Sequence, residues 1–459
     1  MKKIHTTLQT ARTLLFPKPD IKIFKGFGPA FLVIALGIGS GEFILWPYLS
    51  AHYGFGILWG ALLGITIQLI ILVALERHTA FLGEDALSSF TRVFKWAFWW
   101  VLLSTIIGFG WPGFSAMASQ LLVQGLGLGI SETFLSILLL LLASGILLFG
   151  RDTYHTILRI QKINMSFLFA LILFLFIYYF DLEILADMFA GFAGVGESYM
   201  FVPVGLSLLT FMGAVAYAGS GGNLLLMNSF YVEQESKGLV SQRVDDVLMT
   251  PDNSPESVAH TKTFTKTSWK QNTLFFWLTG IILISLLGYI SYAVLHGVTG
   301  VPEDFTFLIL QAEIFSQTIH PVVGVSFIIS GAVALFGVQL GILDFIGRIA
   351  SNKPHTDQQN TALQHKNYRK GLATMALFGL LVLLLGVSKP NTLIIIGSTI
   401  NAFSMGVIAF LLYRVESKIL PSYIASNLFK VLLIAAGIFY IGFFGYVMFA
   451  QFVLQYVIF

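Results

Sequence analysis

The sequence predicts an all-α polytopic membrane protein, and its composition, its apolar segments and the placement of its basic residues support this fold class. Of the 459 residues, 56% are hydrophobic and only 11% are charged, whereas a soluble domain carries about 25% charged residues. The chain contains no cysteine, which excludes disulfides and thiolate metal sites. An ordinary soluble domain is therefore excluded.

Eleven apolar segments are long enough to cross a bilayer as helices, which takes about 20 residues each. They are 27–51, 56–75, 96–123, 133–150, 157–180, 201–231, 272–296, 321–347, 371–387, 391–413 and 429–457. We therefore expect eleven transmembrane helices.

The basic residues predict the orientation of these helices. With the N-terminus inside, 25 of the 26 Lys and Arg residues fall in cytosolic segments, and Lys389 alone lies outside. Lys and Arg collect in cytoplasmic loops, and this asymmetry sets the orientation. We expect the N-terminus inside and the C-terminus outside, and a chain without a targeting segment fits a bacterial cytoplasmic membrane.

Polar stretches divide the chain into parts. Residues 1–26 are predicted to be a basic cytosolic tail, and 232–271, rich in Ser, Thr, Asp and Lys, a flexible cytosolic linker. The predicted division is a first group of five helices over 27–180, an external loop over 181–200, a second group of five over 201–413, and a connection with the eleventh helix over 414–459.

Two glycine-rich stretches interrupt apolar segments at corresponding positions of the two halves. They are Gly37-Ile38-Gly39-Ser40-Gly41-Glu42 in the first segment and Gly219-Ser220-Gly221-Gly222-Asn223 in the sixth. Interrupted helices in corresponding positions are a sequence pointer to the midplane binding site of a secondary transporter. We therefore predict that the first and sixth helices are broken.

A broken helix leaves backbone carbonyl and amide groups without partners, which a bilayer tolerates only around protein or a water-filled cavity. Glu42 adds a carboxylate at membrane depth, where a charged side chain is a functional-site hypothesis by default. The predicted oxygen-lined site consists of Gly37, Gly39, Ser40, Glu42, Ala218, Gly219, Ser220 and Asn223. Glu42 is the candidate metal ligand. The alternative, a packing face with a glutamate that reaches the membrane surface, is less favoured because Glu42 is deep and the motif recurs.

Other polar side chains are secondary candidates. Ser398, Asn401 and Ser404 recur every three residues and form one polar stripe, which either lines the pathway or bonds another helix. Asp344 and Arg348 lie one helical turn apart, as a structural ion pair or an inner gate. Gln68 and Gln120 are expected to bond between helices, and His52 and His78 to lie in water at the membrane edges.

The first segment resembles a known family. Gly28-Pro29-Ala30, then Gly39-Ser40-Gly41-Glu42, then Ala51-His52-Tyr53-Gly54-Phe55-Gly56 are similar to the first helix and following loop of natural-resistance-associated macrophage proteins (Nramp). The resemblance implies proton-coupled transport of divalent metals and the LeuT fold, in which two inverted five-helix repeats are followed by one extra helix here.

The departures from the family lie at its metal site. The family's Asp-Pro-Gly-Asn motif aligns with Gly39, Ser40, Gly41 and Glu42, and its Met-Pro-His motif is missing from the sixth segment. Without a thioether or imidazole ligand, the site is predicted to be all oxygen and suited to hard cations.

Three functions remain open on the sequence. The first is a carrier of a divalent or other hard cation, with possible H⁺ or Na⁺ coupling. The second is a carrier of a small organic solute or anion held at the half-helix N-termini, and the third is a sensor on the same scaffold. We expect no enzyme activity, no cofactor, no nucleic acid and no obligate protein partner, but a lipid bilayer and a small ion or solute.

Overall fold

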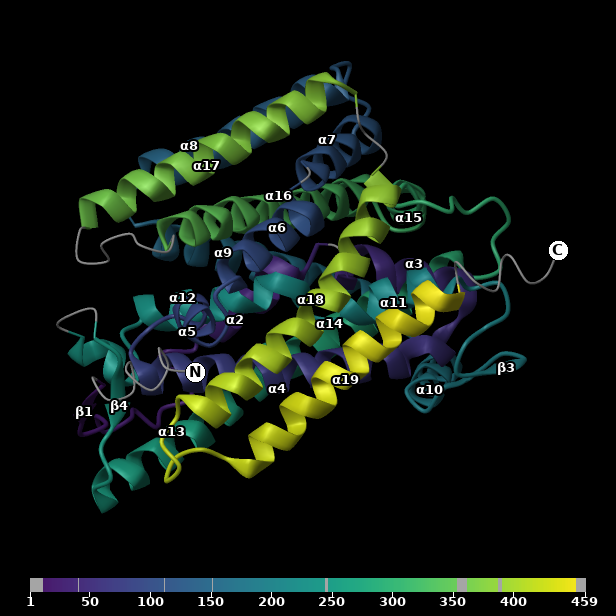
Figure 1. Ribbon diagram of the computed structural model, residues 1–459. Coiled ribbons are helices and arrows are strands. Elements are labelled where there is room, and N and C mark those ends of the chain that lie inside the picture. The colour runs from purple at the N-terminus through teal and green to yellow at the C-terminus, as the bar shows by residue number, and fades with distance from the viewer. Residues whose placement is uncertain are drawn as a thin grey trace.

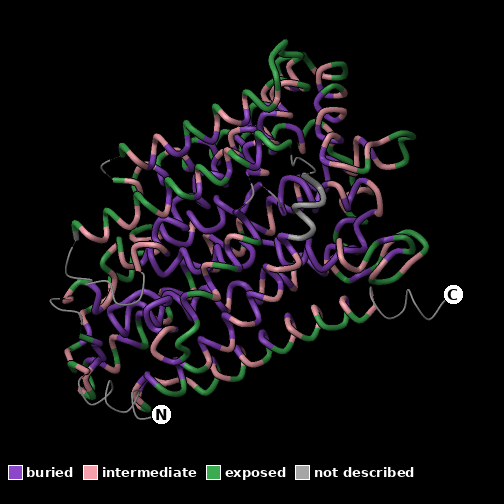
Figure 2. Tube along the Cα trace, turned by 45° about the horizontal axis from the view of Figure 1, so that its top comes forward, coloured by how far each residue is buried: buried purple, intermediate pink, exposed green. Residues whose placement is uncertain are grey.

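The computed structural model describes residues 11–39, 41–110, 112–150, 152–243, 247–352, 361–386 and 390–450, with the side chains of 361 and 390–396 left aside. This part of the chain is mostly helical (Figure 1). Figure 2 shows buried residues along the middle of the molecule and exposed ones on its periphery. The core therefore lies along the central helices, where both predicted breaks also lie.

Eight helices of the described part are long and apolar enough to cross a membrane, or nine if one bent pair is counted as a single span. They include α4 (Leu58–Leu82), the pair α6 (Ala97–Phe109) and α7 (Gly113–Gly125), α8 (Glu132–Phe149), α9 (Thr153–Tyr178), α14 (Thr279–Leu295), α16 (Pro321–Ser351), α18 (Pro390–Lys418) and α19 (Asn427–Phe449). The bent pair is α2 (Gly28–Gly37) with η1 (Gly41–Leu45) and α3 (Trp46–Tyr53). An integral membrane protein is the class that this pattern indicates.

The remaining predicted spans are helical but shorter or more polar. The sixth consists of α11 (Leu208–Ala216), η3 (Gly222–Leu226) and α12 (Met227–Gln234), and the ninth is α17 (Thr361–Leu384). In Figure 1, α17 runs beside α8 and α16, which it also contacts. The total of eleven membrane spans therefore stays a prediction.

The prediction of a flexible linker over 232–271 is wrong over 255–271, where the chain is helical. A helix begins at Pro255 and continues through α13 (Pro255–Asn272) and η5 (Thr273–Leu278) into α14, 41 residues in all. The Ser254 hydroxyl accepts from the Ser257 amide at 3.1 Å and caps the first turn, and proline suits the first helical position. The sequence did not predict this helix because its composition is as polar as that of a linker. The helix extends beyond the apolar part of the bundle.

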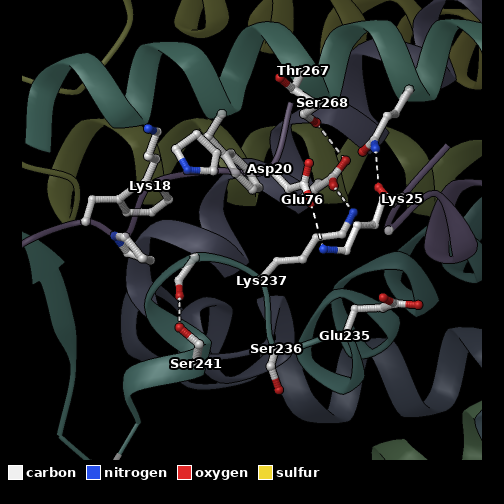
Figure 3. A pocket seen from close by; sticks show the side chains of 17 residues that line it. Lys18, Asp20, Lys25, Glu76, Glu235, Ser236, Lys237, Ser241, Thr267 and Ser268 are labelled. Atoms are coloured by element: carbon white, nitrogen blue, oxygen red, sulfur yellow. Dashed lines mark hydrogen bonds and ion pairs between the residues drawn. The ribbon is translucent and has the colours of Figure 1, made fainter. Parts of the chain in front are cut away.

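The predicted N-terminal tail is also partly folded. Strand β1 (Arg12–Leu14) pairs in parallel with β4 (Met249–Pro251), and the fully buried Phe16 packs edge-on against Phe81 and Phe264, with ring centroids 5.3 and 5.7 Å apart. A pocket of about 270 Å³ lies beside this segment (Figure 3). Its wall includes the Lys237–Glu76 ion pair of 2.5 Å.

Shorter elements close the two ends of the bundle. They are η2 (Phe55–Ile57), α5 (Ala86–Val93), α10 (Leu182–Gly191), the antiparallel pair β2 (Val195–Gly196) and β3 (Tyr199–Met200), η4 (Gly238–Gln242) and α15 (Phe307–Thr318).

Candidate functional site

The first break separates α2 from a π-helical turn. Helix α2 ends at Gly37, the Gly39 amide donates to the Gly37 carbonyl at 2.7 Å, and η1 begins at Gly41, with a bend of 45° between the two parts. Ser40 lies outside the described residues. Single π-helical turns occur often at functional sites, and this one carries Glu42.

The second break lies between α11 and η3, over residues 217–221. Three glycines at this break have positive φ angles, +126° at Gly219, +68° at Gly221 and +51° at Gly222. Only glycine adopts such angles easily. The predicted interruption of the sixth segment thus corresponds to a defined loop between two helices.

The two breaks pack directly against each other. A β-carbon on Gly37 would overlap the carbonyl oxygen of Gly219, and one on Gly41 would overlap that of Tyr217. Gly39 instead faces the side chains of Val338 and Leu335 in α16. The two glycine-rich stretches are thus in direct contact in the fold, and that they form one binding site stays a prediction.

The side chain of Gln68 in α4 stabilises the second break by hydrogen bonds to its backbone. Its Oε1 accepts from the amides of Ser220 and Gly221, both at 3.1 Å, and its Nε2 donates to the Ala216 carbonyl at 3.0 Å. These are backbone groups that the interrupted helix leaves without partners. The expectation that Gln68 bonds between helices is confirmed.

We expect Gln68→Leu to destabilise the protein and to reduce transport, because three buried backbone groups lose their partner at about 1–3 kcal/mol each. Thermal unfolding of the purified protein measures the loss. The matched control is Gln124→Leu, which removes an exposed amide bonded only to Glu132. Equal melting temperatures of the two variants would contradict this role of Gln68.

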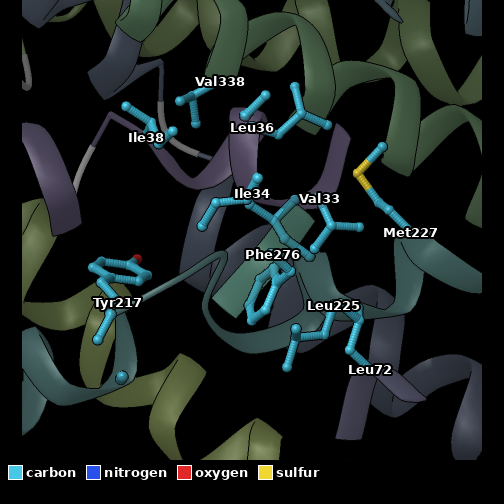
Figure 4. Close-up of a cluster of buried hydrophobic side chains, with 14 of the residues drawn as sticks. Val33, Ile34, Leu36, Ile38, Leu72, Tyr217, Leu225, Met227, Phe276 and Val338 are labelled. Atoms are coloured by element: carbon cyan, nitrogen blue, oxygen red, sulfur yellow. The ribbon is translucent and has the colours of Figure 1, made fainter. Parts of the chain in front are cut away.

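Glu42 is the residue that sets this site apart. It is 0% exposed, and neither carboxylate oxygen has a hydrogen-bond partner among the described residues. The backbone amides of Glu42 itself and of Gly219 lie near the carboxylate, but neither has the geometry of a hydrogen bond to it. Figure 4 shows the apolar surroundings of the breaks, including Ile34, Ile38 and Val338. A lone ionised carboxylate is strongly disfavoured in such a place.

The other buried charged side chains of the described part all have hydrogen bonds or ion pairs. Glu416 pairs with both Arg77 and His78. The other pairs are Glu76 with Lys237, Glu84 with Arg92, Asp85 with Ser88, and Asp344 with Arg348. Glu42 therefore differs from them, because it alone among the buried charged side chains of the described residues has neither a hydrogen bond nor an ion pair.

Three neutral polar side chains near the breaks have an unused oxygen. Asn223 donates through Nδ2 to the hydroxyls of Ser104 at 2.7 Å and Thr105 at 2.9 Å, which leaves its Oδ1 without a partner. The Ser220 hydroxyl is likewise buried without a partner among the described residues. Asn401 donates to the Tyr217 hydroxyl at 3.0 Å, and its Oδ1 is free of hydrogen bonds.

The predicted polar stripe of α18 is buried against the second break. A β-carbon on Gly222 would overlap the amide of Asn401, and one on Gly213 would overlap the hydroxyl of Ser398. Ser404 is buried, and its hydroxyl has no partner among the described residues. Two of the three side chains, Ser398 and Asn401, thus lie directly on the sixth segment.

Asp344 and Arg348 form the predicted ion pair, with 2.8 Å between Oδ2 and Nε. The Tyr368 hydroxyl donates to Asp344 at 2.7 Å, and that of Tyr231 lies 3.5 Å from it. The pair therefore connects α16 with α17 and α12, two segments that the sequence did not join.

The surroundings of His78 correct a prediction. His78 is 1% exposed, not in water, and its Nε2 lies 2.7 Å from Glu416, which also accepts two bonds from Arg77 at 2.8 and 3.1 Å. Residues 419–426, which follow α18, cover this end of α4, since Arg77 also donates to the Ile424 carbonyl. No sequence signal linked Glu416 to α4.

Comparisons with known proteins give a fold but no family. The chain matches no protein-family model and no curated protein sequence. A mutant of the manganese transporter of Eremococcus coleocola matches with a TM-score of 0.65 and 13% identity over 97% of this chain and 92% of that chain. MhsT in complex with L-phenylalanine matches with a TM-score of 0.58 and 15% identity over 92% of this chain and 98% of that chain.

A third solved structure is Mhp1, a nucleobase-cation-symport-1 family transporter, with a TM-score of 0.53 and 15% identity over 93% of this chain and 92% of that chain. At such identities the likeness shows the fold alone. The chain has the LeuT fold of these transporters.

Proposed function

We propose that this protein is a secondary-active transporter of the Nramp type that moves a hard cation by alternating access around Glu42. The observation that carries the proposal is a fully buried carboxylate that has no partner among the described residues and lies where two interrupted helices meet. Binding sites in broken-helix carriers are formed by such interrupted segments near the bilayer midplane.

The chemistry of the site favours a hard cation over a transition metal. The unused groups of Glu42, Ser220, Asn223 and Asn401 are all oxygens. Among the described residues, no group of three or more His, Cys, Asp and Glu side chains is arranged to hold a metal ion. Hard cations prefer oxygen ligands, and soft sulfur ligands select transition metals.

The proposed topology has eleven spans in a bacterial cytoplasmic membrane, with the N-terminus inside and the C-terminus outside. Residues 27–180 and 201–413 form two inverted five-helix repeats, and α19 is the extra helix. The Asp344–Arg348 pair, bonded to Tyr368, serves as an inner gate in this scheme. Coupling to H⁺ or Na⁺ completes the proposed cycle.

A carrier of an organic solute is the second candidate. One of the similar structures holds L-phenylalanine, and the amides at the start of η3 could face an anionic group. Organic solutes belong in the same transport assay for this reason. A sensor without transport would bind a ligand at Glu42 and move none.

We expect cation uptake into proteoliposomes by the wild type and uptake at the level of protein-free liposomes with Glu42→Gln, because the substitution removes the only buried charge of the described residues that lacks a hydrogen bond or ion pair. The assay presents Na⁺, K⁺, Mg²⁺ and Mn²⁺ as tracers, with a proton gradient on and off. The control is Glu313→Gln, which neutralises an exposed acid of α15. Uptake of organic solutes alone would contradict the cation proposal.

A further inference from the structure

The net charge of the proposed site follows from the described side chains around the two breaks. Glu42 contributes one negative charge when it is ionised, and the other unused groups around the breaks, the side-chain oxygens of Ser220, Asn223 and Asn401, are neutral. The backbone oxygens of Tyr217 and Gly219, which face Gly41 and Gly37, are neutral as well. The site therefore carries at most one charge to be balanced.

The surroundings make this balance matter. Glu42 is 0% exposed, and the apolar side chains of Ile34, Ile38, Val338 and Phe276 surround the two breaks (Figure 4). A net charge that is left over in such an interior carries a desolvation penalty that water does not offset. A monovalent cation on Glu42 gives a neutral site, whereas a divalent cation leaves a net positive charge.

The hydration of the cation also favours a monovalent ion over a divalent one. Mg²⁺ gives up its water reluctantly and usually keeps several water ligands when a protein binds it. The Glu42 carboxylate is fully buried, so an ion that keeps several water ligands would have to bring that water into the interior. Monovalent cations lose water more easily and are satisfied by neutral hydroxyl, amide and carbonyl oxygens.

We infer that the site at Glu42 selects a monovalent cation of the Na⁺ or K⁺ class over divalent cations. The inference rests on the proposed function and sharpens it, because it chooses among hard cations by charge. It also differs from what the resemblance to divalent metal transporters implies. Asn401 and Asn223 then determine selectivity by being amides, since a carboxylate at either position would double the negative charge.

The test is a binding measurement on the purified full chain, by thermal stabilisation and by calorimetry, with the chlorides of Na⁺, K⁺, Mg²⁺ and Mn²⁺ at constant ionic strength. We expect the wild type to bind Na⁺ or K⁺ at least about tenfold more tightly than Mg²⁺ or Mn²⁺. Glu42→Gln should lose this binding, and Glu313→Gln should retain it.

The decisive variant adds one charge without changing shape. Asn401→Asp should reverse the preference, so that Mg²⁺ or Mn²⁺ binds at least about tenfold more tightly than Na⁺ or K⁺, because two carboxylates balance two charges. The Tyr217 hydroxyl, which now accepts from Asn401, can donate to the new carboxylate. Asn223→Asp is the second isosteric variant if Asn401→Asp does not fold.

The outcomes separate this inference from the proposed function. Divalent preference in the wild type, or an unchanged preference in both aspartate variants, overturns the inference and leaves cation transport standing. Binding of no cation in the wild type overturns both. Reversal of the preference in either variant supports the inference.

Discussion

Gly41→Ala should abolish both cation transport and stable packing of the two breaks. A β-carbon at this position would overlap the Tyr217 carbonyl oxygen and approach the carbon of that carbonyl to 2.7 Å. Backbone atoms cannot rotate away as the end of a side chain can, so one of the two breaks must move. Overpacking of a core position costs about 1–3 kcal/mol and sometimes more, and here it also displaces Glu42, the next residue.

Thermal unfolding and tracer uptake measure the two effects of Gly41→Ala together. The control is Gly145→Ala in the middle of α8, where a β-carbon meets nothing within 4 Å and alanine favours the helix by about 1 kcal/mol. A Gly41→Ala protein that melts with the wild type and transports normally would show that the breaks do not pack as described.

Glu416→Ala should be the most destabilising single change at the end of the bundle where α4 and α18 end. Glu416 accepts from Arg77 and His78 and from the backbone amide of Ser426, and it is 0% exposed. Its removal leaves a buried arginine without its carboxylate, a loss of about 3–5 kcal/mol. The stacking of Arg77 over the Phe429 ring, at 4.5 Å, is expected to weaken as well.

Unfolding of the purified protein by denaturant or heat tests this expectation. Glu416→Leu combined with Arg77→Met should be more stable than Glu416→Ala alone, because apolar residues replace buried ion pairs at little loss. The exposed-acid variant Glu313→Gln serves again as the control. A double variant that is no more stable than Glu416→Ala would mean that the Arg77–Glu416 pair contributes little.

The sequence predicted most of the helices because apolar length and charge asymmetry are properties of the chain itself. Both glycine-rich stretches lie between helical elements in the structure, and glycines with a carboxylate inside an apolar segment are the signal that favoured a break there. The helix from Pro255 was missed although Ser254, Pro255 and Glu256 form an N-terminal signature. Composition outweighed that signal.

Contacts between distant segments could not be predicted in the same way. Nothing in the sequence joins Gln68 to the second break or Glu416 to Arg77, because both contacts depend on how helices pack. Asn223 is predicted to bind the cargo, and its Nδ2 donates to Ser104 and Thr105. Its remaining oxygen became evident only when those bonds were known.

The most direct test of the central claim is to locate a heavy cation in crystals of the protein by anomalous scattering, with Tl⁺ and Mn²⁺ soaked in separately. A cation site between the breaks predicts a peak at the carboxylate of Glu42, beside Gly219, that disappears in Glu42→Gln. A peak elsewhere, or one that persists in Glu42→Gln, would contradict it.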